Sequence, residues 1–234
     1  MVPASLTVLP VSGLPEIARG ADLASMIAGA VALAEGDVVV VTQKIVSKAE
    51  GRMVEIDPAD PVAKRRLAES EAVRVLRRRG ELVVTETRHG YVCANSGIDL
   101  SNVAEGTAAL LPEDPDRSAR RIRDGLRART GRLVAVVISD TFGRAWRRGV
   151  VDVAIGCAGI RGIVDLRGSR DALGRELVAT EMCLVDEIAG AAELVMGKAS
   201  GVPVAVVRGV DPSALGEGSV IGEVVRPYAE DLFR

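Results

Sequence analysis

The sequence predicts an α/β fold of mixed α+β character, in which helices cover a buried mixed sheet. Two apolar runs rich in β-branched residues, at 38–41 and 134–138, are typical of strands buried on both faces. Helix-like segments alternate with such runs, and this alternation indicates a layered architecture. The 234 residues contain no repeat or linker, so we assign one domain to residues 1–234 and leave the boundaries of any small subdomains open.

The composition excludes several classes of protein. A formal net charge of −2 provides no basic field for nucleic acid or anionic lipid. No apolar run reaches the roughly 20 residues that a membrane helix needs, and we expect no secretory signal peptide. The cysteines Cys93, Cys157 and Cys183 have neither paired nor metal-like spacing, which favours reduced thiols. We therefore expect a cytoplasmic protein that binds neither nucleic acid nor membrane.

The first part of the chain predicts a strand, a helix and a second strand. Residues 6–11 form a short apolar run that is ended by a Ser-Gly turn. Asp22 is positioned to cap a helix at 23–33. Residues 38–41 are four consecutive valines and predict a strand with both faces buried.

Two lysines follow this second strand. If residues 42–48 are helical, Lys44 and Lys48 lie four positions apart on one face. Two cations just beyond a buried strand could hold a triphosphate. The alternative, from the residues alone, is a lysine face that contacts only solvent.

The middle of the chain predicts a helix and a hairpin. An Asp-Pro pair starts a helix that we extend over 61–79, with its arginines in solvent. Residues 81–87 form a strand, and residues 91–94 pair with it in a hairpin. His89 is the only histidine, which excludes sites built from several histidines. We interpret it as a loop residue, with a catalytic base as the alternative.

The second half predicts helices at 118–129 and 181–196 and strands at 134–138 and 202–207. Residues 152–162 are rich in glycine, which permits close approach of the backbone to a ligand. This stretch lacks the spacing of the established phosphate-binding glycine motifs.

Polar residues follow the central strand directly. Asp140 and Thr141 come first, and several arginines follow them. A carboxylate and hydroxyls at the end of a buried strand are a common way for α/β proteins to hold a metal ion and a phosphate. The alternative is that Asp140 and Thr141 only cap the strand and start another helix.

A second polar turn, at 94–103, contains Asp99 and Asn102. Ordinary turn chemistry is one interpretation of this stretch. In the other, Asp99 is a second oxygen ligand and Asn102 hydrogen-bonds a ligand nearby. Mg²⁺ and Mn²⁺ commonly take one or two carboxylates together with phosphate oxygens and water, a requirement that Asp99 and Asp140 would meet.

Seven stretches together, in order, resemble the coenzyme F420-0:γ-glutamyl ligases, including the N-terminal domain of the bifunctional actinobacterial F420 ligase. They are LPVSG at 9–13, VVVVTQKIVSKAEGR at 38–52, ESEAVRVLRR at 69–78, ANSGIDLSNV at 94–103, VAVVISDTFGRAWRRG at 134–149, ELVATEMCLVDEIAGAAELVMGK at 176–198 and PVAVVRG at 203–209. The resemblance covers nearly the whole chain.

The resemblance implies an F420 ligase-like fold and a GTP-dependent ligase that forms C–N bonds in coenzyme F420 biosynthesis. Such an enzyme joins L-glutamate to F420-0 through an acyl phosphate and then adds further γ-linked glutamates. The resemblance also implies Mg²⁺ or Mn²⁺ at two sites, K⁺ as a further ion, and a homodimer.

Individual residues take implied roles by the same resemblance. Asp140 and Lys48 are the catalytic pair, and Asp99, Asp140 and Thr141 hold the metal ions. Lys198 stands where similar archaeal proteins have glutamine, so we expect it to contact phosphate rather than metal. The residues implied in GTP binding are Leu9, Pro10, Val11, Ser12, Gln43, Lys48, Asn102, Gly197 and Lys198.

Two other classes of function stay open at this point. A metal-dependent nucleotide phosphohydrolase or phosphotransferase with the same aspartates would turn over nucleotide without F420-0 or glutamate. A non-catalytic nucleotide-binding module would turn over nothing. The joint presence of Lys48, Asp99, Asp140 and Thr141 argues against the loss of catalysis.

Overall fold

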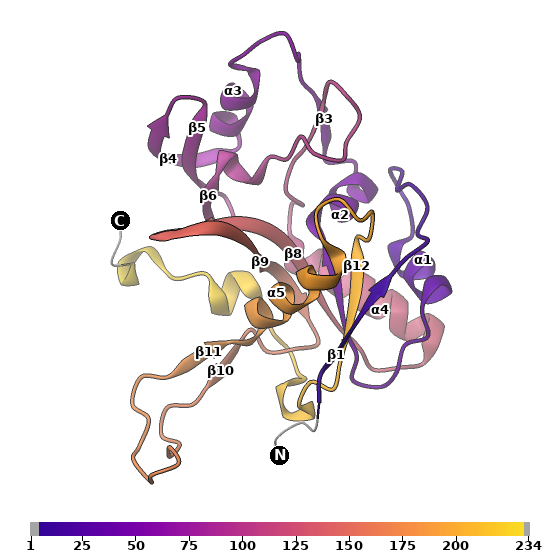
Figure 1. Ribbon diagram of the computed structural model, residues 1–234, viewed down its shortest axis with the longest axis vertical. Helices are drawn as coiled ribbons and strands as arrows, with labels where there is room; N and C mark the ends of the chain where they lie inside the picture. The colour runs from indigo at the N-terminus through magenta and orange to yellow at the C-terminus, as the bar shows by residue number, and fades with distance from the viewer. Residues whose placement is uncertain (1–4, 232–234) are drawn as a thin grey trace.

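A five-stranded mixed sheet forms the centre of the protein (Figure 1). The computed structural model describes residues 5–231, so the first four and last three residues of the predicted domain lie outside the described part. In sheet order the strands are β1 (Thr7–Val11), β12 (Val204–Arg208), β2 (Val38–Thr42), β8 (Ala135–Arg144) and β9 (Arg147–Ala158). β2 and β8 pair in parallel and the other neighbours are antiparallel, which confirms the predicted mixed sheet.

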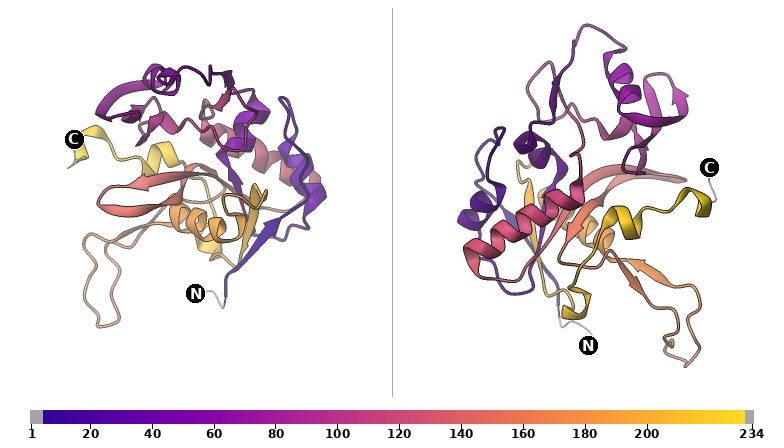
Figure 2. Two further views of the ribbon diagram at one scale, coloured as in Figure 1. Left: turned by 45° about the horizontal axis from the view of Figure 1, so that its top comes forward. Right: turned by 180° about the vertical axis from the view of Figure 1, so that it is seen from behind.

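Helices cover both faces of this sheet. Helix α5 (Leu184–Met196) lies on the face seen in Figure 1, and α4 (Pro115–Thr130) with α1 (Leu23–Ala30) lies on the face seen from behind (Figure 2). Water is therefore excluded from the middle strands, and all four valines of 38–41 are 0% exposed. Asp22 caps α1 as predicted, although the helix ends three residues earlier than expected.

A smaller body lies above the sheet in Figure 1 and has its own apolar core. It is joined to β2 through α2 (Gln43–Glu50). Its elements are α3 (Ala63–Ser70), the antiparallel strands β4 (Ala72–Arg79), β5 (Leu82–Thr87) and β6 (Val92–Ala94), and the pair β3 (Met53–Glu55) and β7 (Thr107–Ala109). The predicted hairpin between residues 81–87 and 91–94 is confirmed by the pairing of β5 with β6.

The predicted helix at 61–79 is wrong beyond its middle. The helix α3 stops at Ser70, and the following residues form β4, which pairs with β5. A cross-strand ion pair joins Arg74 to Glu86 at 2.7 Å, and Val75 packs on the smaller core. These partners are non-local, so they override the helix propensity of an arginine-rich segment.

The polar end of the central strand does not start a helix. β8 continues through Asp140 and Thr141 to Arg144 and turns back into β9, so the capping alternative is wrong. The glycine-rich stretch at 152–162 is largely β9. Gly156 allows the backbone of β9 to approach α4, not a ligand. A Cβ at this position would lie 2.4 Å from the carbonyl carbon of Pro115.

An arm projects from the lower part of the molecule in Figure 1. It starts and ends in the strand pair β10 (Ile163–Asp165) and β11 (Glu181–Cys183), so the predicted helix at 181–196 begins only at Leu184. Short helical turns occupy Asn95–Gly97, Pro212–Ala214, Val220–Val224 and Tyr228–Glu230. Within residues 5–231, every helix is too short or too polar to span a bilayer.

Candidate active site

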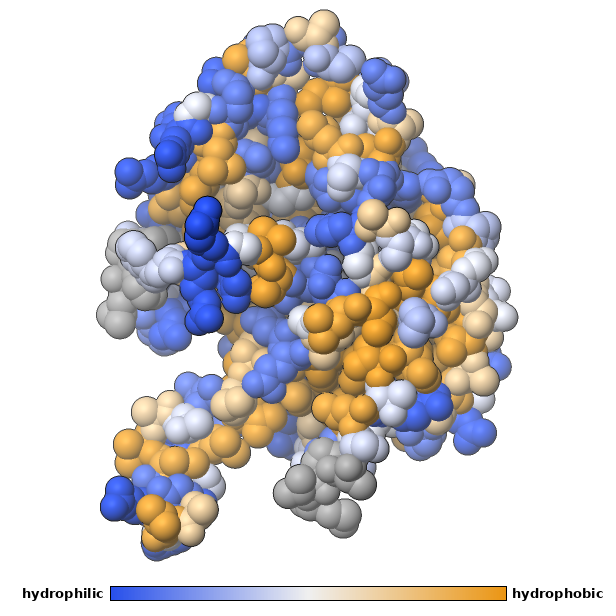
Figure 3. Space-filling model, in the orientation of Figure 1, coloured by the Kyte–Doolittle hydropathy of each residue, from blue (hydrophilic) through white to orange (hydrophobic). Residues whose placement is uncertain are grey.

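The carboxyl end of β2 lies beside the middle of the parallel strand β8, since Thr42 pairs with Ser139, and β8 continues beyond this point to Arg144. This is the edge at which open α/β sheets bind ligands. A cleft of about 430 Å³, called the main cleft, opens there. Its walls are loop 14–17, the start of α2, the turn at 99–102, residues 139–141 of β8 and loop 197–203. Figure 3 shows hydrophilic residues along the band between the smaller body and the α5 layer.

Two cations of α2 enter this cleft from one helix face, as the four-residue spacing predicts. Lys44 lies 2.8 Å from a carboxylate oxygen of Asp99 and also donates to the hydroxyl of Ser101. Lys48 pairs with Glu16 at 2.5 Å. Both lysine side chains are only about one-sixth exposed, at 16% and 15%. The face is therefore partly buried and is not the freely solvated one of the alternative interpretation.

Two carboxylates of the cleft have opposite titration behaviour. Burial alone would raise the pKa of Asp99, but hydrogen bonds from Lys44 and Ser101 hold it below its usual value. Burial raises the pKa of Asp140 to about 7, and the charges of Asp99 and Asp152 act in the same direction. The backbone N–H of Thr141 and the charge of Lys198 oppose that rise. Asp140 therefore lacks a neighbouring cation strong enough to keep it fully ionised.

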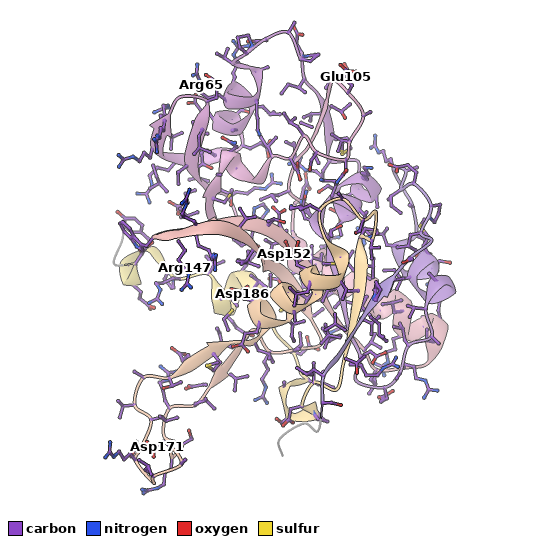
Figure 4. All side chains as sticks on the ribbon, viewed as in Figure 1. Arg65, Glu105, Arg147, Asp152, Asp171 and Asp186 are labelled. Atoms are coloured by element: carbon purple, nitrogen blue, oxygen red, sulfur yellow. The ribbon has the colours of Figure 1, made fainter. Side chains whose placement is uncertain are left out.

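A third carboxylate, Asp152, was missed by the sequence analysis. It projects from β9 beside β8, lines the main cleft and is 5% exposed (Figure 4). Its two oxygens accept hydrogen bonds from Ser139 at 2.9 Å and from Thr141 at 2.6 Å. Only the hairpin pairing of β8 with β9 reveals this contact, because the sequence places Asp152 in a stretch notable for its glycines.

The donor set fits a divalent cation that is shared with a phosphorylated ligand. Residues 5–231 contain no cluster of three or more His, Cys, Asp or Glu that could hold a metal alone. Mg²⁺ and Mn²⁺ do not need such a cage, since they commonly use one or two carboxylates and complete their shell with phosphate oxygens and water. The carboxylates of Asp99 and Asp140 and the hydroxyl oxygen of Thr141 are donors of the required kind.

A side chamber of about 420 Å³ adjoins the main cleft. It lies between the turn at 93–102 and the β8–β9 hairpin. The two spaces share Asp99, Asn102, Asp140, Thr141 and Lys198. The candidate metal ligands therefore stand at the junction of two ligand-sized spaces.

Comparison with known proteins decides the family. The sequence profile of the F420-0:gamma-glutamyl ligase family matches residues 13–209. The coenzyme F420:L-glutamate ligase of Methanothermobacter thermautotrophicus is 41% identical, over 98% of this chain and 99% of its own length. Those of Methanopyrus kandleri and Archaeoglobus fulgidus are each 42% identical, over 98% and 97% of this chain and 98% and 96% of their own lengths. The chain belongs to the F420-0:gamma-glutamyl ligase family. This confirms the resemblance and the predicted enzyme class, a ligase that forms C–N bonds.

The fold brings most of the residues that the family resemblance implied into one place. The main cleft is lined by Gln43, Lys48, Asp99, Asn102, Asp140, Thr141, Gly197 and Lys198. Leu9, Pro10, Val11 and Ser12 lie on β1 and just after it, outside that lining, and residues 14–17 form the wall instead. The contact of residues 9–12 with GTP stays a prediction.

Gln43 and Asn102, like Lys48, Asp99 and Thr141 above, already have protein partners. The side-chain amide nitrogen of Gln43 donates to Ser47 at 2.6 Å and to the carbonyl of Leu110 at 2.8 Å, so it ties α2 to the smaller body. The side chain of Asn102 donates to the carbonyl of Lys198 at 3.3 Å and links the two loops that face each other across the cleft.

His89 lines neither of the two spaces. It is 8% exposed, stacks on Tyr91 and lies within hydrogen-bonding distance of the carbonyls of Pro112 and Glu113. Burial lowers its pKa. These contacts give the only histidine a packing role under the smaller body.

Proposed function

We propose that this chain is a coenzyme F420-0:L-glutamate ligase that uses GTP and a divalent cation. It joins glutamate to the carboxylate of F420-0 and then adds further glutamates by γ-linkage. Family membership and the names of the relatives support the ligation. The nucleotide, the cation and the acyl-phosphate route are inferred from the chemistry of the site.

The meeting of two spaces at Asp140 carries this proposal. A ligase that activates a carboxylate must hold a phosphoryl donor and an acceptor so that their reacting atoms meet. The main cleft has the cations that a triphosphate requires, and the side chamber opens toward the same aspartates. A phosphohydrolase needs only the first space.

The lysines and the oxygen ligands of the site have separate electrostatic roles in the proposed reaction. Lys44, Lys48 and Lys198 surround the main cleft and would neutralise phosphate charge during transfer. Asp99, Asp140 and the hydroxyl of Thr141 would hold Mg²⁺ or Mn²⁺. When bound, the cation lowers the electrostatic barrier to attack on a phosphoryl group. A second divalent site and a K⁺ site stay predictions.

Two displacements complete the proposed reaction. First, the γ-phosphoryl group of GTP moves to an oxygen of the F420-0 carboxylate, and GDP is released. Second, the amino nitrogen of glutamate bonds to the carbonyl carbon, phosphate leaves with the bonding electrons, and the nitrogen loses a proton. Because GTP is a cytoplasmic nucleotide, we place the proposed reaction in the cytoplasm.

We extend the proposal to a homodimer because of the arm. Its residues Leu173 and Val178 are each 79% exposed, and Figure 3 shows the arm standing clear of the body with apolar residues along it. An apolar groove of about 480 Å³ at its base is lined by residues such as Ile188 and Val207. A second copy of the chain would cover this surface. Light scattering coupled to size-exclusion chromatography would measure the molar mass in solution and so distinguish a dimer from a monomer.

A ligation assay tests the function. The protein is incubated with F420-0, L-glutamate, GTP and Mg²⁺ or Mn²⁺, and products are followed by mass spectrometry together with GDP release. We expect glutamate-sized mass additions that require both GTP and metal. Asp140→Asn should abolish them, whereas Asp124→Asn, on the exposed face of α4, should not.

Other outcomes would replace the proposal. GDP release without mass additions would favour a phosphohydrolase or a different acceptor. A folded protein that binds GTP and yields neither product would favour the binding-module alternative.

A further inference from the structure

The β8–β9 hairpin extends past the side chamber and ends in a short turn (Figure 1). Phe142, Gly143 and Val150, on its two strands, line the chamber. Beyond them lie residues 144–148, here called the hairpin tip, all of which are exposed. Figure 4 labels Arg147 in this tip. Whatever occupies the side chamber therefore lies next to the hairpin tip.

The presence of a tryptophan at position 146 of this tip is not explained by a contribution to folding. It is the only tryptophan of the chain and is 89% exposed. Its φ of 64° is in the left-handed region, where a bulky residue is an outlier and glycine is favoured. Neither burial nor turn geometry selects tryptophan here. Exposed aromatic rings of this kind are typical of binding surfaces, where they stack on a ligand.

The tip also concentrates unpaired positive charge. Among residues 5–231, Arg144, Arg147 and Arg148 form no ion pair, and the one side-chain bond is from Arg144 to the carbonyl of Arg148 at 3.3 Å. Arginines on neighbouring hairpins differ, since Arg74 pairs with Glu86 and Arg167 with Asp165. Three guanidinium groups without an ion pair, on residues next to or two positions from one exposed tryptophan, match a ligand that is both anionic and aromatic.

We propose that the hairpin tip is the binding element for the distal part of the acceptor. Arg144, Arg147 and Arg148 hold its anionic group, and Trp146 stacks on its flat ring. The inference rests on the proposed function, because the acceptor's carboxylate must reach Asp140 while the rest of the molecule leads outward along β8. Asp140 and Arg144 are four strand positions apart, or about 13 Å. The distal deazaflavin ring of F420-0, which is flat and carries an acidic hydroxyl, has this chemistry, whereas its phosphodiester adjoins the reacting carboxylate and would stay near Asp140.

Calorimetric titration with F420-0, and separately with GTP, tests the tip apart from turnover. Trp146→Gly should weaken F420-0 binding by about 10-fold or more. It should leave the melting temperature unchanged or raised, because glycine adopts the left-handed φ freely. If Trp146 had only a structural role, its loss would lower the melting temperature and would not selectively weaken F420-0 binding.

A charge variant provides the second arm. Arg144→Gln/Arg147→Gln/Arg148→Gln should lose about 10-fold or more in F420-0 affinity and most of its dependence on salt. The matched control, Arg117→Gln/Arg127→Gln/Arg132→Gln, makes the same change of charge on and just after α4 and should bind as the wild type does. GTP affinity should be unchanged in all of these variants.

The outcomes separate this proposal from the proposed function. If both hairpin variants bind F420-0 as tightly as the wild type, the role of the hairpin tip is overturned and the proposed function is not. The same holds if the variants lose as much affinity for GTP as for F420-0. A wild-type protein that neither binds nor extends F420-0 would overturn the proposed function and this inference with it. Quenching of the single tryptophan by F420-0, without quenching by GTP, is the expected spectroscopic result.

Discussion

Thr141 on β8 donates its hydroxyl proton to Asp152, its cross-strand partner on β9, across 2.6 Å. The second oxygen of Asp152 accepts from Ser139. With its proton held by a buried carboxylate, the Thr141 oxygen keeps its lone pairs available on the side of the cleft. Asp152 is therefore positioned to orient Thr141, one of the proposed metal ligands.

Asp152→Asn tests this positioning role. An amide presents a donor where Thr141 or Ser139 now donates, so one hydroxyl must turn away. Loss of such an outer contact typically reduces activity or metal affinity by about 10- to 100-fold. We expect the Mg²⁺ or Mn²⁺ concentration for half-maximal ligation to rise, with little change in melting temperature. Unchanged metal dependence would show that Asp152 acts only in folding.

Asp140 gives a prediction for stability against pH. Its pKa rises from an ordinary 3.8 to about 7 in the folded protein, so folding favours the protonated form. This contribution to stability is complete below about pH 3.8 and is lost as pH rises through about 7. In EDTA, Asp140→Asn should match the wild type near pH 4 and exceed it by about 1–2 kcal/mol at pH 8, a figure reduced because the carboxyl is partly exposed. Urea denaturation at the two pH values measures the difference, and a constant gap would contradict it.

The sequence anticipated the parts of the site that depend on local pattern. A four-residue spacing predicted that Lys44 and Lys48 share a face, and the end of a buried strand marked Asp140. These features need only helix periodicity and sheet topology. The mixed sheet was predictable for the same reason, since its middle strands are continuous apolar runs.

Non-local pairing explains what the sequence did not reveal. Asp152 meets Thr141 only because the hairpin has a register shift after Ile138, which no local pattern encodes. The sequence of residues 72–79 predicts a helix, but in the fold these residues pair with β5 and form a strand. Glu16 reaches Lys48 from a loop that carries no motif. Each of these contacts joins segments whose relation is set by the tertiary fold.

The pair between Glu16 and Lys48 predicts competition with nucleotide. Glu16 is 83% exposed, and its carboxylate occupies a position near Lys48 that a phosphate oxygen would take. Exposed pairs are worth about 0.2–1 kcal/mol, so Glu16→Gln should tighten GTP binding by no more than about fivefold. Lys48→Met should weaken it by about 10-fold or more. Calorimetry without acceptor measures both, and weaker GTP binding by Glu16→Gln would mean that Glu16 contacts the nucleotide directly.

Gly156 lets helix α4 pack in direct backbone contact with strand β9. A Cβ at this position would lie 2.4 Å and 2.5 Å from the backbone carbonyl atoms of Pro115, at the start of α4, and neither backbone can yield without moving the helix. Gly156→Ala should therefore lower the free energy of unfolding by about 1–3 kcal/mol. Gly29→Ala is the matched control, because Gly29 lies in α1 with nothing within 4 Å of its added Cβ. It should raise the free energy of unfolding by about 0.5–1 kcal/mol. Urea denaturation measures both, and equal stability of the two variants would mean that α4 does not rest on β9 as closely as described.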